Sequence, residues 1–424
     1  MPLPPVALYA HVPFCVARCP YCDFVVYAGA DARGPKARTS QLFDALATEL
    51  ELRADVVAAE FGPGEARPPL RSVYFGGGTP SLMPPERVAR LISIARARLG
   101  VADDAEITLE ANPGPDELGD MAGFRRAGVT RVSFGAQSFD AQELRRLGRR
   151  HSPADVAGAV AAARAAGIGS VNLDLLYDVP GQSVSSWADS LAAALALEPD
   201  HLSLYALTLD DPEAEGLTGE TGDHLATPRG ARRWRELAKA DQDDDRAAEQ
   251  YELASEMLAA AGWHHYEISN WARPGRESRH NLVYWRRQPY EAIGPGAHAF
   301  DGAVRRWNAA SMEPYLAALA PLPEPGRRPT PAAGQALETG RPLLPPGGRE
   351  TLTENVARAE AVILALRLDS GIPAAWADVA PLLDSRSWAQ AAGLLEAFRG
   401  AGGQRLRLTP RGRLLSNELF SRLV

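Results

Sequence analysis

The sequence predicts an α/β fold built on a parallel sheet, because two patterns recur along the first half of the 424-residue chain. Short apolar runs alternate six times with amphipathic stretches, as in β/α units joined by right-handed crossovers. Polar or glycine-rich segments follow nearly every apolar run, so they would gather at the carboxyl ends of the strands. A (β/α) barrel carries its active site on that face, and the second pattern therefore favours a full or partial barrel over an open doubly wound sheet.

The expected elements follow one another in regular order. Apolar runs predict strands over residues 8–12, 72–75, 106–110, 129–134, 170–176 and 201–207. Helical periodicity predicts helices over residues 41–60, 85–99, 116–127, 153–166 and 183–197. The segments at the strand ends are the cysteine loop, Gly76-Gly-Gly-Thr-Pro80, Glu110-Ala-Asn-Pro113, Gly135-Ala-Gln-Ser138 and Asp174 with Pro180-Gly-Gln182. Turns, helix breakers and caps would explain each segment alone, but five together indicate a site.

All three cysteines of the chain, Cys15, Cys19 and Cys22, lie in one loop with the spacing C-x₃-C-x₂-C. Three thiolates can hold a [4Fe-4S] cube with one open iron, whereas electron-transfer clusters use four thiolates. A zinc site with His11 as the fourth ligand is the alternative, although structural zinc sites usually present two separated ligand pairs. The odd count and tight spacing disfavour disulfides, so we expect reduced thiols and a cytoplasmic protein.

Composition excludes several classes of protein. The net charge of −8 gives no overall attraction to nucleic acid, and we expect no nucleic-acid partner. An RNA-modifying enzyme would be expected to append a basic domain, and none is apparent. No apolar run approaches the ~18 residues of a membrane-spanning helix, and the N-terminus lacks the features of a signal peptide.

The cysteine loop and the three motifs that follow it resemble the radical SAM superfamily, specifically its branch related to oxygen-independent coproporphyrinogen III oxidase. The resemblance implies a partial (β/α)₆ TIM-like barrel over residues 1–310. It also implies that Cys15, Cys19 and Cys22 hold a [4Fe-4S] cluster with S-adenosylmethionine (SAM) on the free iron. Residues 311–350 are expected to form a Pro/Gly-rich linker, and residues 351–424 a small C-terminal domain with helices over 353–368 and 389–398, a strand over 405–408 and a terminal helix over 414–420.

The resemblance assigns cofactor contacts, each with a physical reason. Glycines without Cβ admit a ligand close to the backbone, carboxylates accept from hydroxyl or amino groups, and an arginine fork suits the SAM carboxylate. One departure is Asp178, where the family commonly has glycine, which puts the local loop geometry in doubt. The expected contacts are Tyr9, Tyr21, Gly77, Gly78, Thr79, Glu110, Gln137, Arg149, Asp174 and His280.

Within this branch, the segments 266–275, 279–285 and 294–298 resemble the HemW-type heme chaperones more than the oxidase. These chaperones carry a His-Asn-x-x-Tyr-Trp element implicated in heme binding, which here begins at His280. We expect His280 to ligate heme, with His264, His265 and His298 as alternatives. His280 and Asn281 could instead form a hydrogen-bonded loop that supports the barrel rim.

The expected function is therefore that of a heme chaperone, which binds heme and delivers it to acceptor hemoproteins, membrane-associated respiratory enzymes among them. The alternative is an oxygen-independent coproporphyrinogen III oxidase. In the oxidase family a long N-terminal arm precedes the cluster loop, which continues Cys-x-Cys. Here Cys22 is followed by Asp23 and Phe24. We expect no coproporphyrinogen oxidase activity and no catalytic residue, while SAM cleavage and oligomeric state stay open.

Overall fold

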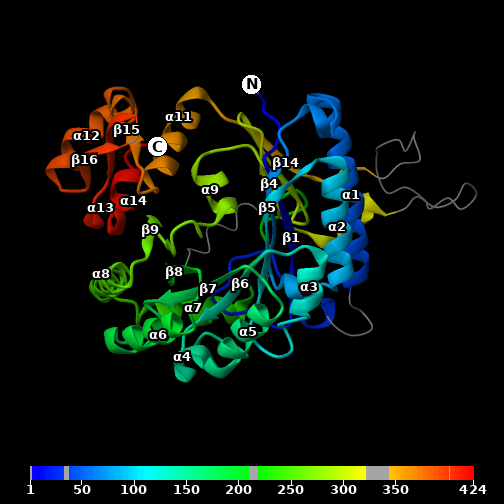
Figure 1. Cartoon of the computed structure of the whole chain (residues 1–424), viewed down its shortest axis with the longest axis horizontal. Helices are drawn as coiled ribbons and strands as arrows, with labels where there is room; N and C mark the ends of the chain where they lie inside the picture. Colours follow the sequence, from blue (N-terminus) through cyan, green and yellow to red (C-terminus); the bar gives the residue numbers. More distant parts are fainter. Residues whose placement is uncertain (1, 33–37, 210–217, 321–342, 401) are drawn as a thin grey trace, which may run out of the picture.

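The protein is described by a computed structural model over residues 2–32, 38–209, 218–320, 343–400 and 402–424. Its main feature is a nine-stranded sheet in the order β11-β1-β4-β5-β6-β7-β8-β10-β9. Figure 1 labels the six central strands of this sheet, β1 and β4 to β8. The six central strands run parallel in chain order and confirm the six predicted strands. They are β1 (Ala7–Val12), β4 (Leu70–Gly77), β5 (Val101–Ala111), β6 (Arg131–Gln137), β7 (Ser170–Tyr177) and β8 (His201–Ala206).

Three short strands extend the two edges of this sheet. β11 (Glu291–Ile293) pairs with β1 in parallel, whereas β10 (Asn270–Ala272) and β9 (His264–Glu267) add antiparallel strands beside β8. The edge strands β11 and β9 do not pair with each other among the described residues, so the sheet is a partial barrel. This confirms the predicted α/β fold class.

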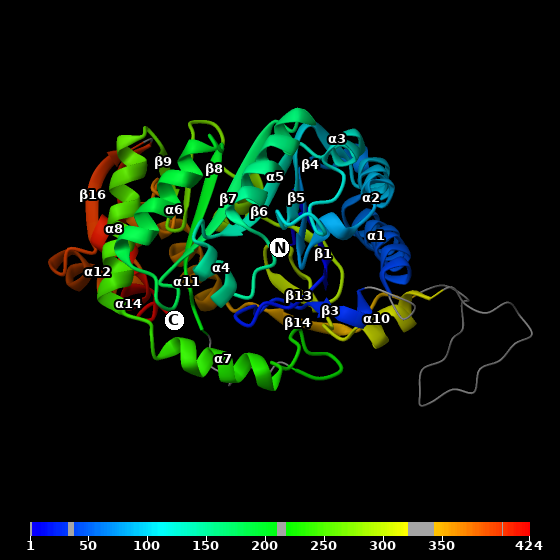
Figure 2. The same ribbon diagram turned by 90° about the horizontal axis from the view of Figure 1, so that it is seen from below.

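Helices cover the outside of the curved sheet (Figure 2). The five predicted helices are α1 (Thr39–Phe61), α2 (Pro85–Arg98), α3 (Met121–Ala127), α5 (Pro153–Ala165) and α6 (Val184–Ala196). α3 begins later than predicted because Asp120 caps it by accepting from the Gly123 amide at 2.8 Å. The other helices of this part are α4 (Ala141–Arg146), α7 (Arg229–Lys239), α8 (Asp244–Ala260), α9 (Arg279–Trp285) and α10 (Met312–Leu319).

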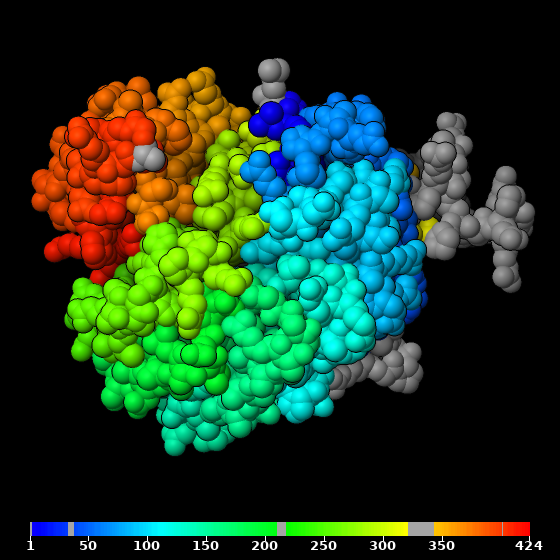
Figure 3. Space-filling view, in the orientation of Figure 1, coloured from blue at the N-terminus to red at the C-terminus, as the bar shows by residue number. Residues whose placement is uncertain are grey.

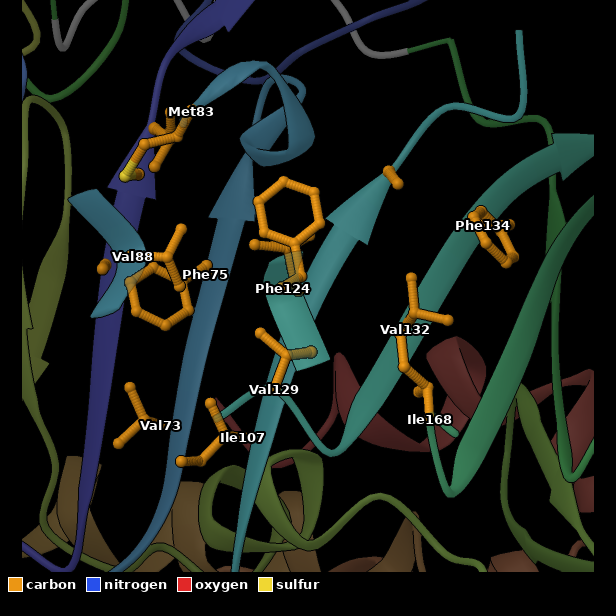
Figure 4. Close-up of a cluster of buried hydrophobic side chains, with 14 of the residues drawn as sticks. Val73, Phe75, Met83, Val88, Ile107, Phe124, Val129, Val132, Phe134 and Ile168 are labelled. Carbon is orange, nitrogen blue, oxygen red and sulfur yellow. The ribbon is translucent and has the colours of Figure 1, made fainter. Parts of the chain in front are cut away.

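The core lies between the strands and these outer helices (Figure 4). Phe75 and Phe134 project from strands β4 and β6, and Phe124 projects from α3, each at most 1 % exposed. Burying one such side chain contributes roughly 1.5–3 kcal/mol. With this face of the strands filled by apolar side chains, the polar residues of the strands point to the inside of the barrel.

The segment after the barrel contains two smaller sheets. β12 (His298–Phe300), β13 (Val304–Asn308) and β14 (Gly347–Thr351) pair antiparallel beside the cysteine side of the barrel. The predicted linker 311–350 thus begins with α10 and ends with β14, and its residues 321–342 lie outside the described residues. The elements that follow are α11 (Glu354–Leu366), β15 (Ile372–Pro373), α12 (Leu382–Ala391), β16 (Leu395–Gly400), β17 (Gly403–Leu408), α13 (Pro410–Leu414) and α14 (Ser416–Phe420).

One predicted element of the C-terminal segment is wrong. The sequence predicts a helix over residues 389–398, but α12 ends at Ala391 and residues from Leu395 form strand β16. Gly393 takes a left-handed conformation with φ of +70°, which ends the helix. Leu395 then pairs with Leu408 of β17 and is buried against it.

The C-terminal segment has a core of its own and packs against the β9 edge of the barrel (Figure 3). Glu267 in β9 is fully buried, and Arg367 after α11 donates to it at 3.2 Å. Leu368 forms an isolated β-bridge with the same Glu267. Within the described ranges, no helix is both long and apolar enough to span a membrane.

Candidate functional site

A cavity of about 440 Å³ opens inside the barrel at the carboxyl ends of the parallel strands. Residues from β4, β5, β6, β7 and β8 line its wall, and the cysteine loop forms one side. The structure therefore brings together most of the predicted site. The predicted residues that line the cavity are Cys15, Cys19, Tyr21, Cys22, Gly77, Gly78, Glu110, Gln137, Arg149 and Asp174.

The cysteine loop runs between two short parallel strands, β2 (Phe14–Cys15) and β3 (Tyr27–Ala28). Cys15 is buried, and its Sγ accepts from Thr79 Oγ1 at 3.4 Å. Cys19 and Cys22 are partly exposed, and the Cys22 amide donates to the Cys19 carbonyl at 3.2 Å. This turn points both thiols toward the cavity, beside the glycine segment.

Helix α7 secures the loop from the other side. Arg235 donates through Nε to the Pro20 carbonyl at 3.2 Å and through Nη2 to the Cys22 carbonyl at 3.1 Å, and it also pairs with Asp23. Figure 2 shows α7 on the opposite side of the molecule from α3 and α5. One buried guanidinium thus fixes the loop that carries all three thiols.

The structure gives no support to a zinc site that uses His11 as its fourth ligand. A [4Fe-4S] cube takes its thiolates at separate corners, so its donors surround a volume rather than a point. No three His, Cys, Asp or Glu side chains within the described residues converge as ligands of one ion. His11, the alternative fourth ligand, has Nδ1 bonded to the Tyr9 hydroxyl at 2.9 Å and Nε2 to the Val25 carbonyl at 2.8 Å.

Without a metal, Cys15 and Cys22 are held in their protonated form. Burial, with repulsion from the neighbouring thiolates, raises the pKa of Cys15 to about 12 and that of Cys22 to about 11. A bound cation reverses this preference, because a metal deprotonates a coordinating thiol. The loop therefore has the chemistry of a metal-binding loop rather than of a nucleophile.

The glycine segment forms the floor next to the cysteines. The Gly78 amide donates to the Val12 carbonyl at 2.9 Å, and a Cβ on Gly78 would lie 2.7 Å from the Phe14 carbonyl oxygen. Gly77 has φ of +114° and donates its amide to Glu110 at 2.9 Å. Only glycine satisfies both positions, and the exposed backbone forms a polar cradle for a ligand that approaches closely.

Glu110 and Asp174 place two carboxylates on the inner wall. Glu110 accepts from the Tyr74 hydroxyl at 2.7 Å, and burial raises its pKa to about 7 against the opposing effect of that hydrogen bond. Asp174 accepts from Asn172 at 2.7 Å and from Ser133 at 3.1 Å, and burial raises its pKa as well. These side chains can accept from hydroxyl or amino groups of a polar ligand.

Gln137 and Arg149 lie at the end of β6 and after α4. Gln137 has φ of +66°, a strained value for a residue other than glycine that functional sites often contain. Arg149 donates to Cys19 Sγ at 3.3 Å and to the Gly135 carbonyl at 2.8 Å, and it also bonds Asn112. Its Nη groups thus brace the loop and the strand ends, and contact with a SAM carboxylate stays a prediction.

Three predicted contacts lie outside the cavity lining. Thr79 is fully buried behind Cys15, and Tyr9 faces a second cavity where it bonds His11. His280 is 1 % exposed, and its Nδ1 bonds Ser72 at 2.9 Å while its Nε2 bonds the Tyr284 hydroxyl at 2.8 Å. Neither ring nitrogen of His280 is free to bind iron. Heme ligation by His280 stays a prediction that requires both hydrogen bonds to break.

The alternative histidines differ in how many of their ring nitrogens are hydrogen-bonded. His264 bonds Glu277 at 3.2 Å and Asp369 at 2.7 Å through its two nitrogens. His265 bonds Arg413 at 2.5 Å and the Ile268 carbonyl at 3.2 Å. His298 has a hydrogen bond to Asp223 through Nε2 and lies at the wall of the second cavity.

Asp178, the departure from the family's pattern, keeps a glycine-like backbone. Its φ is +55°, and its buried carboxylate pairs with Arg246 of α8. Its amide donates to Gln250 at 2.9 Å. Aspartate tolerates this conformation better than most residues, so the loop geometry is retained by two contacts with α8.

Sequence reasoning missed several residues of the cavity. Asn112 lies within the Glu110 motif and bonds Thr79 at 2.9 Å, so its motif could have identified it. The others are polar residues at alternating positions of buried strands, a pattern that marks an inward face. They are Tyr74, Arg131, Ser133, Asn172, Ser203 and Tyr205.

Comparison with known proteins agrees with this geometry. The sequence profile of the Radical SAM superfamily matches residues 9–194. The structure of coproporphyrinogen III oxidase (HemN) from Escherichia coli, a radical SAM enzyme, superimposes with a TM-score of 0.73 at 22 % identity, covering 100 % of this chain and 91 % of that one. The fold and the cavity thus define a protein of the radical SAM type, whose members bind a [4Fe-4S] cluster and SAM.

Two relatives narrow the class of protein further. Heme chaperone HemW from Mycobacterium tuberculosis is 39 % identical over 424 residues, which cover 100 % of this chain and 96 % of that protein. Heme chaperone HemW from Escherichia coli K12 is 38 % identical over 308 residues, which cover 72 % of this chain and 73 % of that protein. The chain therefore belongs to the family of the heme chaperone HemW.

Proposed function

We propose that this chain is a heme chaperone that carries a SAM-ligated [4Fe-4S] cluster, binds heme and delivers it to acceptor hemoproteins. The observation that carries the proposal is the cavity that three cysteines and a glycine cradle line, in a chain related over its full length to the heme chaperone HemW of Mycobacterium tuberculosis. Delivery to membrane-associated respiratory enzymes is part of the same proposal.

In this proposal Cys15, Cys19 and Cys22 hold the cluster. Arg235 and Thr79 keep the loop in place through the contacts described above. When bound, the cluster would supply an open iron and an electron to SAM. The protein's own contribution is to fix the positions of the three thiols and to shield them within the barrel, while the bound metal would favour their deprotonated form.

The inner wall is proposed to hold SAM. Gly77 and Gly78 lack a Cβ and let its methionine end come close to the backbone, while Glu110 and Asp174 accept from its hydroxyl or amino groups. Arg149, Gln137 and Tyr21 complete the proposed contacts. With a pKa of about 7, Glu110 can hold or release a proton near neutral pH as the ligand requires.

Anaerobic reconstitution with iron and sulfide tests the proposal. The reduced protein should show the EPR signal of a [4Fe-4S] cluster, SAM should perturb that signal, and added hemin should bind with a defined Soret band. Replacing any one cysteine by alanine should abolish the signal of the reduced cluster. Stoichiometric zinc without iron after anaerobic purification would contradict the cluster, and absence of a Soret band would contradict heme binding.

A further inference from the structure

A second cavity of about 240 Å³ lies beside the cysteine loop. It shares Asp23 and Phe24 with the main cavity, so the two adjoin at the residues that follow Cys22. Three tyrosines line it, Tyr9, Tyr284 and Tyr290. Its walls therefore combine aromatic rings with polar tips.

The histidines of the chain differ in their availability to a metal. All eight lie in the described ranges. His151 is only 8 % exposed, and two others are half-exposed at the wall of the second cavity, His224 and His298. Both ring nitrogens are hydrogen-bonded in the remaining five, which are His11, His201, His264, His265 and His280.

Asp223 joins the two available histidines. Its carboxylate accepts from His224 Nδ1 at 2.8 Å and from His298 Nε2 at 2.7 Å, and its side chain is only 5 % exposed. A carboxylate on Nδ1 fixes the tautomer that leaves the Nε2 lone pair free, as in metal-ligating histidines with a carboxylate partner. His224 Nε2 makes no hydrogen bond to any residue that the structure describes. In His298 the bonded nitrogen is Nε2. Only Nδ1, which lies nearer the backbone, is then left as a possible metal ligand.

The backbone around His224 is held by the small sheet β12-β13-β14. Trp307 of β13 donates its indole NH to the Thr221 carbonyl at 3.1 Å, and the Ala310 amide donates to the Gly222 carbonyl at 2.8 Å. Trp307 also pairs across the strands with His298, with the rings 5.9 Å apart and 24° from parallel. Asp223 and His224 thus follow two anchored residues directly.

We infer that His224, oriented by Asp223, is the protein ligand of the heme iron, with the porphyrin lying against the tyrosines of the second cavity. The inference rests on the proposed heme binding and specifies where it occurs. Heme iron commonly takes a histidine ligand on one face. The cavity is smaller than the usual ~300–1,000 Å³ of enclosed ligand sites, so much of the porphyrin stays exposed, as release to an acceptor requires.

The test uses the full chain titrated with hemin. His224→Gly should weaken binding at least tenfold or shift the Soret band, and added imidazole should restore the wild-type spectrum by occupying the vacated position. Asp223→Asn should weaken binding roughly 10–100-fold as a positioning residue, because outer partners of metal ligands have effects of that size. Far-UV circular dichroism checks that each variant is folded.

The outcomes separate this inference from the proposed function. Failure of the wild-type chain to bind hemin would contradict the proposed function itself. Normal binding by wild type and by His224→Gly would overturn only the inference. Loss of the Soret band in His298→Ala or His280→Ala, with His224→Gly unchanged, would likewise overturn it and assign the ligand to the residue replaced.

Discussion

Replacement of Gly78 by alanine tests how closely the glycine segment approaches the cysteine loop. The added Cβ would lie 2.7 Å from the Phe14 carbonyl oxygen and 3.0 Å from the Phe14 nitrogen, whereas ordinary contact begins at 3.4 Å. Both atoms belong to the backbone, so the loop has to move by about 0.7 Å. Overpacking of this kind typically destabilises a protein by 1–3 kcal/mol.

The same movement should weaken the cofactor site. The Phe14 carbonyl also accepts from the Thr79 amide at 2.7 Å, and Cys15 follows Phe14 directly. Gly78→Ala is therefore expected to lower the free energy of unfolding in urea by about 1–3 kcal/mol. It should also reduce SAM affinity in calorimetric titrations of the reconstituted protein, because the cysteines and the cradle no longer keep their spacing.

Gly158→Ala provides the matched control. Gly158 lies within helix α5, and a Cβ there would meet nothing within 4 Å. Alanine should stabilise the helix by about 0.5–1 kcal/mol, because glycine is the weaker helix former. Equal urea midpoints and equal SAM affinities for Gly78→Ala and wild type would refute the reasoning.

Three further predictions concern buried charges. The pKa of Glu110 is about 7 in the folded protein against an ordinary 4.5, so the folded state binds a proton that the unfolded state releases. The free energy of unfolding should therefore fall as the pH rises from 4.5 to 7. Glu110→Gln should flatten that fall in urea titrations. Arg235→Ala removes the contacts that fix the cluster loop and should speed oxygen-induced bleaching of the cluster several-fold, whereas exposed Arg229→Ala should not. Glu49→Ala leaves a buried arginine unpaired and should destabilise by about 3–5 kcal/mol, compared with about 0–1 kcal/mol for the surface ion-pair residue Glu51.

Each of these predictions has a contradicting result. An unchanged pH slope in Glu110→Gln would show that another group carries the proton. Equal bleaching rates for the two arginine variants would mean that α7 does not support the loop. Similar urea midpoints for the Glu49 and Glu51 variants would show that the buried network around α1 contributes little.

The central strands could be predicted because they are buried on both faces of the sheet and read as apolar runs. Strand β6, for example, carries Val132 and Phe134 outward and Ser133 inward. The local sequence is therefore enough to predict both the strand and the face that lines the cavity. The edge strands were missed because β9, β10 and β11 are only three or four residues long. Pairing between distant segments defines them, and sequence periodicity does not report such pairing.

Site residues that belong to a sequence motif could be predicted, whereas site residues outside the motifs could not. Cys15, Gly78 and Glu110 belong to contiguous motifs at strand ends, and the structure gathers them in one cavity. His280 also belongs to a motif, yet only the fold shows that both its nitrogens are occupied. His224 lies in no motif, and its availability depends on a carboxylate shared with His298, some 74 positions along the chain.

Transfer of heme to an apo-hemoprotein tests the central claim most directly. The reconstituted, heme-loaded protein is mixed anaerobically with an apo-acceptor, SAM, an electron donor and coproporphyrinogen III, and both the acceptor's Soret band and the porphyrin products are followed. We predict that heme appears in the acceptor while coproporphyrinogen III is recovered unchanged. Repeated turnover to protoporphyrinogen IX without transfer of heme would contradict the account and favour the oxidase.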